Sequence, residues 1–317
     1  MSVTQATLRS LEVGLASLDA AREVNNKLGG VGITGDVFYC DPTSGSDNNS
    51  GKAPDDAKKT ANETIGLCSA NNGDVIVWMR GSESVTETVA FDVTGLTLMV
   101  QGFGGPKAAM GEYNAIYSAA AFVDGPAVTI TAPTTIIGLG MVSRDATATF
   151  FGGAACLIGG TATASPYGVH LYKCRFPKWG LDNRFGLSIE GGSDIHIESC
   201  EFEGVGADFE AGIYMQGATA NLEISDNRFT DCDYAMEFGS ITGSGPGPDL
   251  DFHHNRIITP DSKGLDTNTQ TCRGIIYNNW FTTDVGTSTY DRSTAALETA
   301  GIILTGNHYA TEATGPT

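Results

Sequence analysis

One arrangement of apolar and polar residues occurs six times between residues 169 and 309. Each copy has two apolar positions separated by one residue, two polar positions, an Asn or Cys, one variable residue and a large apolar residue. The copies begin at Val169, Ile195, Leu222, Leu250, Gly274 and Ile302, and the fifth lacks an apolar residue at its first position. Short strands repeated at intervals of 26, 27, 28, 24 and 28 residues predict a solenoid in which each repeat forms one coil.

The Asn or Cys of each copy is expected at a bend between two strands. The alternating apolar residues before the bend place one face of a strand inside, and the large apolar residue after it enters the interior again. An Asn at a bend bonds backbone groups that the turn leaves unpaired, and it tolerates left-handed backbone angles. Because coils stack about 4.8 Å apart, equivalent residues form ladders. One interior column is predicted to contain Phe176, Phe202, Phe229, Ile257, Phe281 and Tyr309.

The repeat and the segment before it resemble the right-handed parallel β-helices of the pectate-lyase-like superfamily. Residues 37–41, 45–51, 59–60 and 73–77 are similar to the opening coil of many such proteins. The resemblance covers residues 36–310 and implies an all-β fold, a single-stranded right-handed parallel β-helix, for residues 31–317. It also implies that residues 60–68 form a short helix that closes the N-terminal end of the barrel.

A separate N-terminal α-helix is predicted within residues 1–30. Leu8, Leu11, Leu15 and Leu18 recur at helical spacing, and glycines at positions 29 and 30 end the pattern. The leucine stripe has two interpretations. It packs on its own barrel as an additional cap, or it forms a trimerisation or virion-docking segment. We favour the second, because the segment near residue 60 already supplies a cap.

The repeat becomes less regular between residues 104 and 168. Residues 134–141 fit a further coil, whereas the Ala- and Gly-rich stretches 107–117 and 146–163 are expected to be loops that leave the barrel. Residues 240–248, rich in Gly, Ser and Pro, are a third expected loop.

The charge of the chain restricts its partners. With 37 acidic and 18 basic residues the net charge is −19, which disfavours nucleic acid, anionic membranes and polyanionic glycans. No apolar run approaches the ~18 residues of a membrane span, and the first residues lack the apolar core of a signal peptide. Seven cysteines without metal-site spacing indicate reduced thiols. In a β-helix these features favour a phage virion protein made in the host cytoplasm and released by lysis.

Candidate binding residues lie in three columns that are expected to face outward. The columns contain His170, His196, Glu223 and Asp251; Tyr172, Glu198, Ser225, His253, Tyr277 and Thr305; and Arg175, Glu201, Arg228, Arg256, Trp280 and His308. Such a surface suits a subunit interface, in which Arg, Tyr and Trp concentrate, a solvated ladder, or a sugar or metal site. We favour the interface, with candidate residues Leu8, Leu11, Leu15, Leu18, His170, His196, Arg228, Arg256 and Trp280.

No catalytic residue and no cofactor is predicted. A metal site formed by His170, His196 and Asp251 is unfavourable because two coils separate the first residue from the last. Carboxylate pairs suited to glycoside hydrolysis are too common in so acidic a chain to be informative. The resemblance implies that a polygalacturonase-like enzyme would carry Asn-Thr-Asp, Asp-Asp, Gly-His-Gly and Arg-Ile-Lys in order. Here His253-His254 lacks the glycines, and residues 256–258 lack the lysine.

The expected function is that of a phage structural protein. We expect a homotrimeric β-helix on the virion, either a capsid decoration protein or a short spike, that contacts the major capsid protein or another virion protein. The alternative is a tailspike or depolymerase that binds or cleaves a neutral polysaccharide of the host surface. A third alternative is a carbohydrate-binding module outside any phage.

Overall fold

The computed structural model describes residues 34–79, 81–101, 114–119, 125–143, 154–159, 166–177, 184–204, 209–217, 219–239, 249–258, 263–266, 272–283 and 301–311. The predicted N-terminal helix, including its four leucines, and the expected loop at 240–248 lie outside these residues. Within the described residues, no helix is long and apolar enough to cross a membrane.

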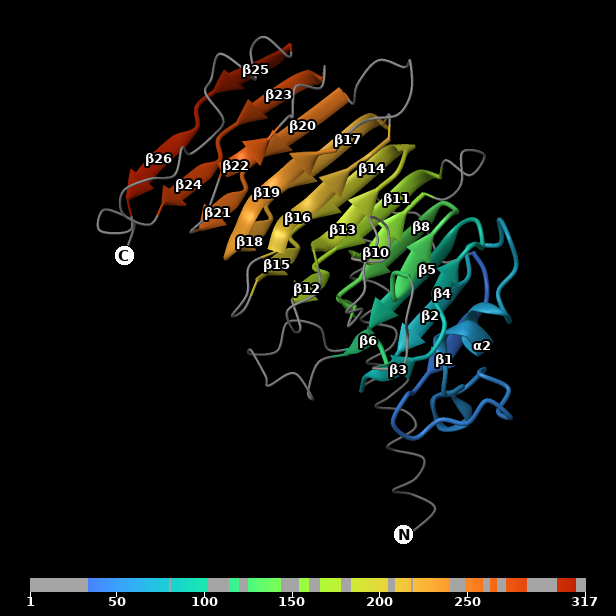
Figure 1. Ribbon diagram of the computed structural model, residues 1–317. Helices are drawn as coiled ribbons and strands as arrows, with labels where there is room; N and C mark the ends of the chain where they lie inside the picture. Colours follow the sequence, from blue (N-terminus) through green and yellow to red (C-terminus); the bar gives the residue numbers. More distant parts are fainter. Residues whose placement is uncertain are drawn as a thin grey trace, which may run out of the picture.

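The chain forms three sheets whose neighbouring strands all pair in parallel (Figure 1). The ten-stranded sheet contains, in order, β1 (Val37–Cys40), β2 (Val75–Trp78), β5 (Leu96–Val100), β8 (Thr134–Ile137), β11 (Tyr167–Tyr172), β14 (Gly192–Glu198), β17 (Thr219–Ser225), β20 (Asp249–His253), β23 (Arg273–Tyr277) and β25 (Ile302–Thr305). The nine-stranded sheet contains β3 (Glu83–Val85), β6 (Ala115–Ser118), β9 (Gly140–Val142), β12 (Arg175–Pro177), β15 (Glu201–Glu203), β18 (Arg228–Thr230), β21 (Arg256–Ile258), β24 (Trp280–Thr283) and β26 (His308–Thr311). The seven-stranded sheet contains β4 (Val89–Phe91), β7 (Val128–Ile130), β10 (Ala154–Ile158), β13 (Phe185–Ile189), β16 (Phe209–Met215), β19 (Cys232–Phe238) and β22 (Lys263–Asp266).

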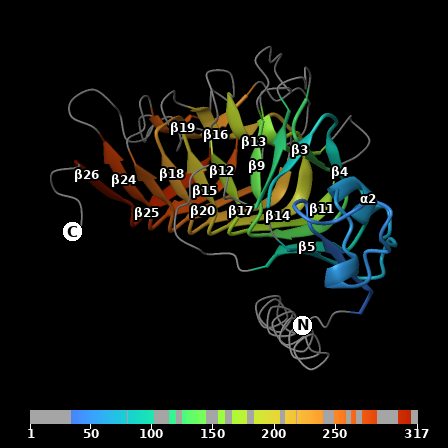
Figure 2. The ribbon, with the colours of Figure 1, turned by 90° about the horizontal axis from the view of Figure 1, so that it is seen from below.

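Each coil passes through the ten-, nine- and seven-stranded sheets in turn, so successive coils stack along one axis (Figure 2). This is the predicted right-handed parallel β-helix. A 3-10 turn, η1 (Pro54–Asp56), and one short helix, α2 (Ala61–Ile65), precede the second coil. The helix buries Ala61, Thr64 and Ile65 at the N-terminal end of the barrel, which confirms the helix expected within residues 60–68.

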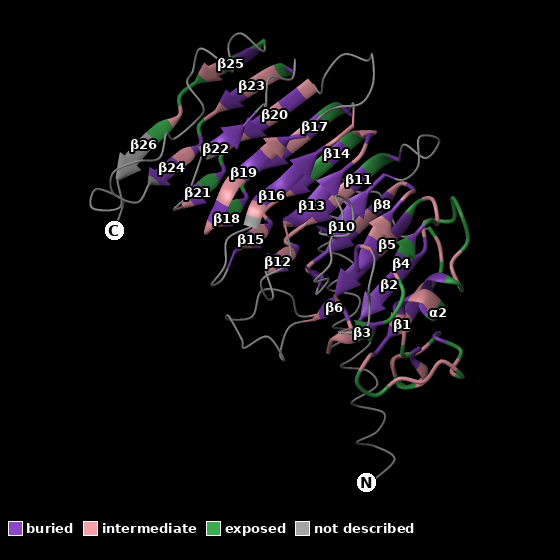
Figure 3. Cartoon of the chain, in the orientation of Figure 1, coloured by how far each residue is buried: buried purple, intermediate pink, exposed green. Residues whose placement is uncertain are grey.

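The interior is filled by columns of apolar side chains, and the buried residues follow the inner faces of the strands (Figure 3). Phe176, Phe202 and Phe229 lie on β12, β15 and β18, and the ring centroids of successive residues are 4.6 and 4.7 Å apart. The strand register continues this column through Ile257, Phe281 and Tyr309. The predicted order of the column is therefore confirmed.

The Asn residues form a buried ladder at the bend between the ten- and nine-stranded sheets. Asn227 Oδ1 accepts a hydrogen bond from the backbone N–H of Cys200, and its Nδ2 donates to the Ile197 carbonyl, each at 2.8 Å. The left-handed angle falls one residue before each ladder position, at Lys173, Ser199, Asp226, His254 and Asn278, with φ between 52° and 57°. The preceding residue thus makes the corner, and the Asn itself supplies only hydrogen bonds.

Two of the expected loops contain strands. The stretch 107–117 includes the start of β6, and the stretch 146–163 includes β10 in the seven-stranded sheet. All five residues of β10 are buried. Because the strand is covered on both faces, its sequence shows no alternation of polar and apolar residues, and the prediction of a loop was wrong there.

Candidate functional site

The three outward columns exist with the predicted register. His170 pairs with His196, then Glu223 and Asp251 follow on the next two strands of the ten-stranded sheet. The second column on that sheet continues from Tyr172 through Tyr277 to Thr305. The third column, which contains Arg228, Arg256 and Trp280, lies on the nine-stranded sheet. The sequence-predicted residues are therefore divided between two faces of the molecule.

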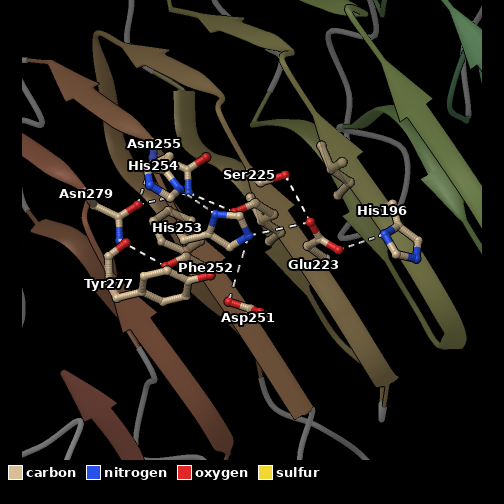
Figure 4. A network of polar contacts seen from close by, with 12 residues as sticks. His196, Glu223, Ser225, Asp251, Phe252, His253, His254, Asn255, Tyr277 and Asn279 are labelled. Carbon is tan, nitrogen blue, oxygen red and sulfur yellow. Dashed lines mark hydrogen bonds and ion pairs between the residues drawn. The ribbon is translucent and has the colours of Figure 1, made fainter. Parts of the chain in front are cut away.

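Glu223 lies at the centre of a polar network on the ten-stranded sheet (Figure 4). Its Oε2 is 3.0 Å from His196 Nδ1, and its Oε1 is 3.5 Å from His253 Nε2. The Ser225 hydroxyl donates to Glu223 Oε1 at 3.3 Å. Because this hydroxyl forms its hydrogen bond with a carboxylate and not with an imidazole, it lacks the base that would activate a serine nucleophile.

The network extends to the C-terminal end of β20. His253 Nδ1 and His254 Nδ1 are 2.8 Å apart, so one ring donates and the other accepts, and the two histidines cannot both be fully protonated. The His253 ring also stacks on Tyr277, with centroids 4.8 Å apart. Asp251 Oδ1 is 4.0 Å from His253 Nε2 but is buried without a hydrogen-bond partner.

A pocket of about 270 Å³ lies beside this network on the ten-stranded sheet. Its lining combines acceptors, donors and a small apolar floor, from His196, Asn221, Leu222, Glu223, Asp249, Leu250, Asp251 and Gly274. Arg273 fixes one wall, because its Nε lies 3.1 Å from Asp249 Oδ1. Gly274 occupies the position that is apolar in the other repeats, and it borders the pocket with no side chain to fill it. Mixed polar groups in a concave site suit a ligand with several hydroxyl groups.

His170 lies at the other end of the first column. Burial lowers its pKa, while Glu198, whose Oε2 is 3.4 Å from His170 Nε2, opposes this shift. The ring of His170 contacts that of His196 edge-on, with centroids 5.8 Å apart. His170 therefore supports the position of His196 by packing.

In the part of the chain that the structure describes, no three His, Cys, Asp or Glu side chains are grouped so that they could hold a metal ion. The strand register places His170 and Asp251 three strands apart, in agreement with the argument that they cannot share a metal.

A second polar cluster lies on the outer face of the seven-stranded sheet, and sequence reasoning missed it. Arg184 binds both carboxylate oxygens of Glu210, and Phe185 stacks on Tyr214 with centroids 4.2 Å apart. In the strand register, Glu237 lies opposite Tyr214 on β16 and opposite Asp266 on β22. Its Oε2 is buried without a hydrogen-bond partner. The weak signal was the third strand of each coil, in the seven-stranded sheet, whose outward residues include these carboxylates.

Burial raises the pKa of Glu237 to about 7, and the carboxylates of Glu210 and Asp266 act in the same direction. A carboxyl group that is neutral near pH 7 can donate a proton, as a general acid does. This environment distinguishes Glu237 from the many exposed carboxylates of the chain.

Glu237→Gln is expected to stabilise the protein at pH 8 and to have little effect near pH 4. The folded pKa of about 7 exceeds the ordinary value of 4.5. The carboxyl group therefore favours folding fully below pH 4.5, and this contribution is lost as the pH rises through 7. Partial solvent screening reduces the gain at pH 8 to about 1–2 kcal/mol. Urea unfolding at both pH values measures it, with Glu63→Gln on an exposed helix position as the control. Equal effects of Glu237→Gln on the free energy of unfolding at both pH values would contradict the raised pKa of Glu237.

The parallel sheets, the Asn ladder and the stacked interior columns define a right-handed parallel β-helix. The chain belongs to the right-handed β-helix family, since the family model for the right handed beta helix region matches residues 157–315.

Solved structures with the same fold are distant in sequence. A deglycosylated pectin methylesterase from Aspergillus niger has a TM-score of 0.52 and 10% identity, with 88% of this chain and 86% of that chain covered. A rhamnogalacturonan lyase has a TM-score of 0.47 and 12% identity, with 89% of each chain covered. No curated protein matches the sequence. At these identities the likeness concerns the fold alone.

Proposed function

We propose that this protein binds a neutral polysaccharide on the outer face of its ten-stranded sheet, as a surface component of a phage virion. The observation that carries the proposal is the pocket beside Glu223, which presents carboxylate, amide and imidazole groups to one ligand-sized space. A sugar ring offers hydroxyl groups that donate to carboxylates and accept from imidazole or amide N–H groups. The side chains of Glu223 and Asp251, which are 39% and 46% exposed, supply the acceptors.

The charge of the face supports a neutral rather than an anionic ligand. Glu223, Asp249 and Asp251 line the pocket, and Arg273 neutralises only Asp249. A polyanionic glycan would be repelled by these carboxylates and by the net charge of −19 of the chain. The pectin methylesterase that shares the fold is named for a polysaccharide, which agrees with a glycan ligand on this scaffold.

Glu223→Gln and Asp251→Asn are each expected to weaken binding about tenfold or more. Each substitution keeps the side-chain size but removes a charged acceptor, and a hydrogen bond to a charged group contributes about 1.5–3 kcal/mol. Affinity electrophoresis in gels that contain dextran, mannan, galactan or alginate measures the retardation of each variant. Glu201→Gln is the matched control, because Glu201 lies on the neighbouring nine-stranded sheet.

The expected pattern is retardation by at least one of the neutral polymers, none by anionic alginate, and loss in the two pocket variants only. Retardation by alginate alone, or equal retardation of all variants, would show that the pocket does not bind a neutral glycan.

Cleavage of a glycan on the seven-stranded sheet, a different sheet from that of the Glu223 pocket, is a second candidate function, favoured by the raised pKa of the Glu237 carboxyl group beside the Arg184–Glu210 pair. Glu237 and Asp266 lie opposite each other on adjacent strands, and a glycosidase needs two carboxyl groups close together. Release of reducing ends that stops in Glu237→Gln, but continues in Glu63→Gln, would establish it. If the protein binds a glycan but releases no reducing ends, its function is binding without cleavage.

We also propose that the protein forms a homotrimer and is located on a virion. All seven cysteines are free thiols, six of them buried, which supports folding in a reducing cytoplasm. Labelled antibody against this protein should decorate purified virions in electron micrographs, and virions that remain unlabelled would contradict the location.

A further inference from the structure

The outer face of the nine-stranded sheet carries a stripe of cationic and aromatic side chains. Arg228 and Arg256 are paired on adjacent strands, and Trp280 and His308 continue the same column. Both arginines and His308 are exposed, and Trp280 is half-buried. We call these four residues the Arg–Trp stripe.

The two arginines of the stripe lack carboxylate partners, in contrast to the other arginines that the structure describes. Arg175 pairs with Glu201, Arg184 with Glu210, and Arg273 with Asp249. Among described residues, Arg228 donates from Nε to the Thr230 hydroxyl at 3.2 Å. Glu201 lies opposite Arg228 on the neighbouring strand, but its carboxylate binds Arg175, and no described carboxylate forms an ion pair with Arg228 or Arg256.

The lack of an ion pair at Arg228 and Arg256 is unusual in a chain with so many carboxylates. Two like charges directly opposed on neighbouring strands repel each other. The chain has 37 acidic residues, yet in this column Glu201 forms its ion pair with Arg175, and Arg256 lies between Arg228 and Trp280. A negatively charged group from outside the chain would relieve the repulsion.

The aromatic end of the stripe also points to a protein contact. Trp280 stacks on His308, with ring centroids 5.6 Å apart, and its Nε1 is buried without an acceptor. Arg and Trp are the residues that most often dominate the energy of a protein interface.

We propose that the Arg–Trp stripe binds the acidic surface of a second copy of this chain. Every copy carries a net charge of −19, so most approaches between copies are repulsive, and the stripe offers a complementary charge. Contact of one stripe with another stripe would oppose arginine to arginine. The stripe therefore faces a different, acidic surface of the other copy, an arrangement provided by a closed ring such as a trimer or by a twofold dimer with two such contacts.

The test is the oligomeric state of the full chain in solution. Light scattering at low ionic strength is expected to give a multiple of 33.1 kDa. Arg228→Glu with Arg256→Glu is expected to raise the dissociation constant at least roughly 100-fold and to give the mass of one chain. Lys52→Glu with Lys59→Glu is the matched control, because it makes the same charge change at exposed positions of the N-terminal coil.

Further readouts separate the possible outcomes. The neutral pair Arg228→Gln with Arg256→Gln replaces the charge reversal if circular dichroism shows that the latter fails to fold, and it should weaken association at least tenfold. A wild-type protein that is monomeric, or an arginine variant that stays oligomeric, would overturn the proposal. So would binding of alginate by a monomeric wild-type protein, because the occupant would then be an acidic glycan. Dextran, mannan or galactan binding at the Glu223 pocket should persist in the arginine variants, so this proposal and the glycan proposal fail independently.

Discussion

Phe229→Ala is expected to lower the free energy of unfolding by about 3–5 kcal/mol. Phe229 is only 1% exposed, and its ring stacks on Phe202 with centroids 4.7 Å apart. The ring also lies against the backbone of β16 in the seven-stranded sheet, where a Cβ atom added to Gly212 would lie 2.7 Å from it. Parallel pairing on both sides of β18 holds the coil spacing, so neighbouring coils cannot move together to close the cavity.

Urea unfolding followed by circular dichroism measures this loss. Phe229→Leu is the control, because it keeps most of the apolar volume and should cost clearly less. A loss below about 1 kcal/mol for Phe229→Ala would show that the column tolerates a cavity, contrary to the dense packing of protein interiors.

The sequence was sufficient to predict the regions in which every coil uses the same pattern. The strand before each Asn alternates inward and outward residues, so the order of Phe202 and Phe229 inside, and of His196 and Glu223 outside, follows from the repeat alone. A shift of one residue would move every apolar side chain to the solvent face, which is why register is so strongly determined.

Prediction failed where the pattern carries no alternation or where loops vary in length. Strand β10 is buried on both faces and was taken for part of a loop. Glu237 lies on β19, the third strand of its coil, whose position depends on the connection from β18 and not on the repeat. Sequence alone therefore could not place it beside Asp266 and Tyr214.

The pocket illustrates a different limit. Gly274 is visibly irregular in the sequence, because it replaces an apolar residue of the repeat. The pocket itself depends on how the side chains of His196, Glu223 and Asp251 turn on three neighbouring strands, and periodicity fixes the face of a residue but not its rotamer. The outward columns could be predicted, whereas the network centred on Glu223 required the structure.

Asn255→Leu is expected to destabilise the protein by about 3–6 kcal/mol, although the two side chains have similar volumes. Asn255 Oδ1 accepts from the backbone N–H and from Nδ2 of Asn227, at 2.9 and 3.0 Å. Its Nδ2 donates to the Ile224 carbonyl at 2.8 Å and to Asn279 Oδ1 at 3.0 Å (Figure 4). Leucine would leave four polar groups without these hydrogen bonds in a site where Asn255 is 1% exposed, and each unpaired buried group costs about 1–3 kcal/mol.

Asn307→Leu, at the last position of the same ladder, is the matched comparison. Its Oδ1 accepts from Asn279, and its Nδ2 donates to the Ile276 carbonyl, but Asn307 is only half-buried. Water can therefore reach the groups that lose their hydrogen-bond partner. The expected loss in the free energy of unfolding is less than half that of Asn255→Leu. Urea unfolding of both variants measures the difference. Equal losses would mean that the ladder stabilises the barrel through packing alone, because only the hydrogen-bond argument predicts a difference between the buried middle and the hydrated end.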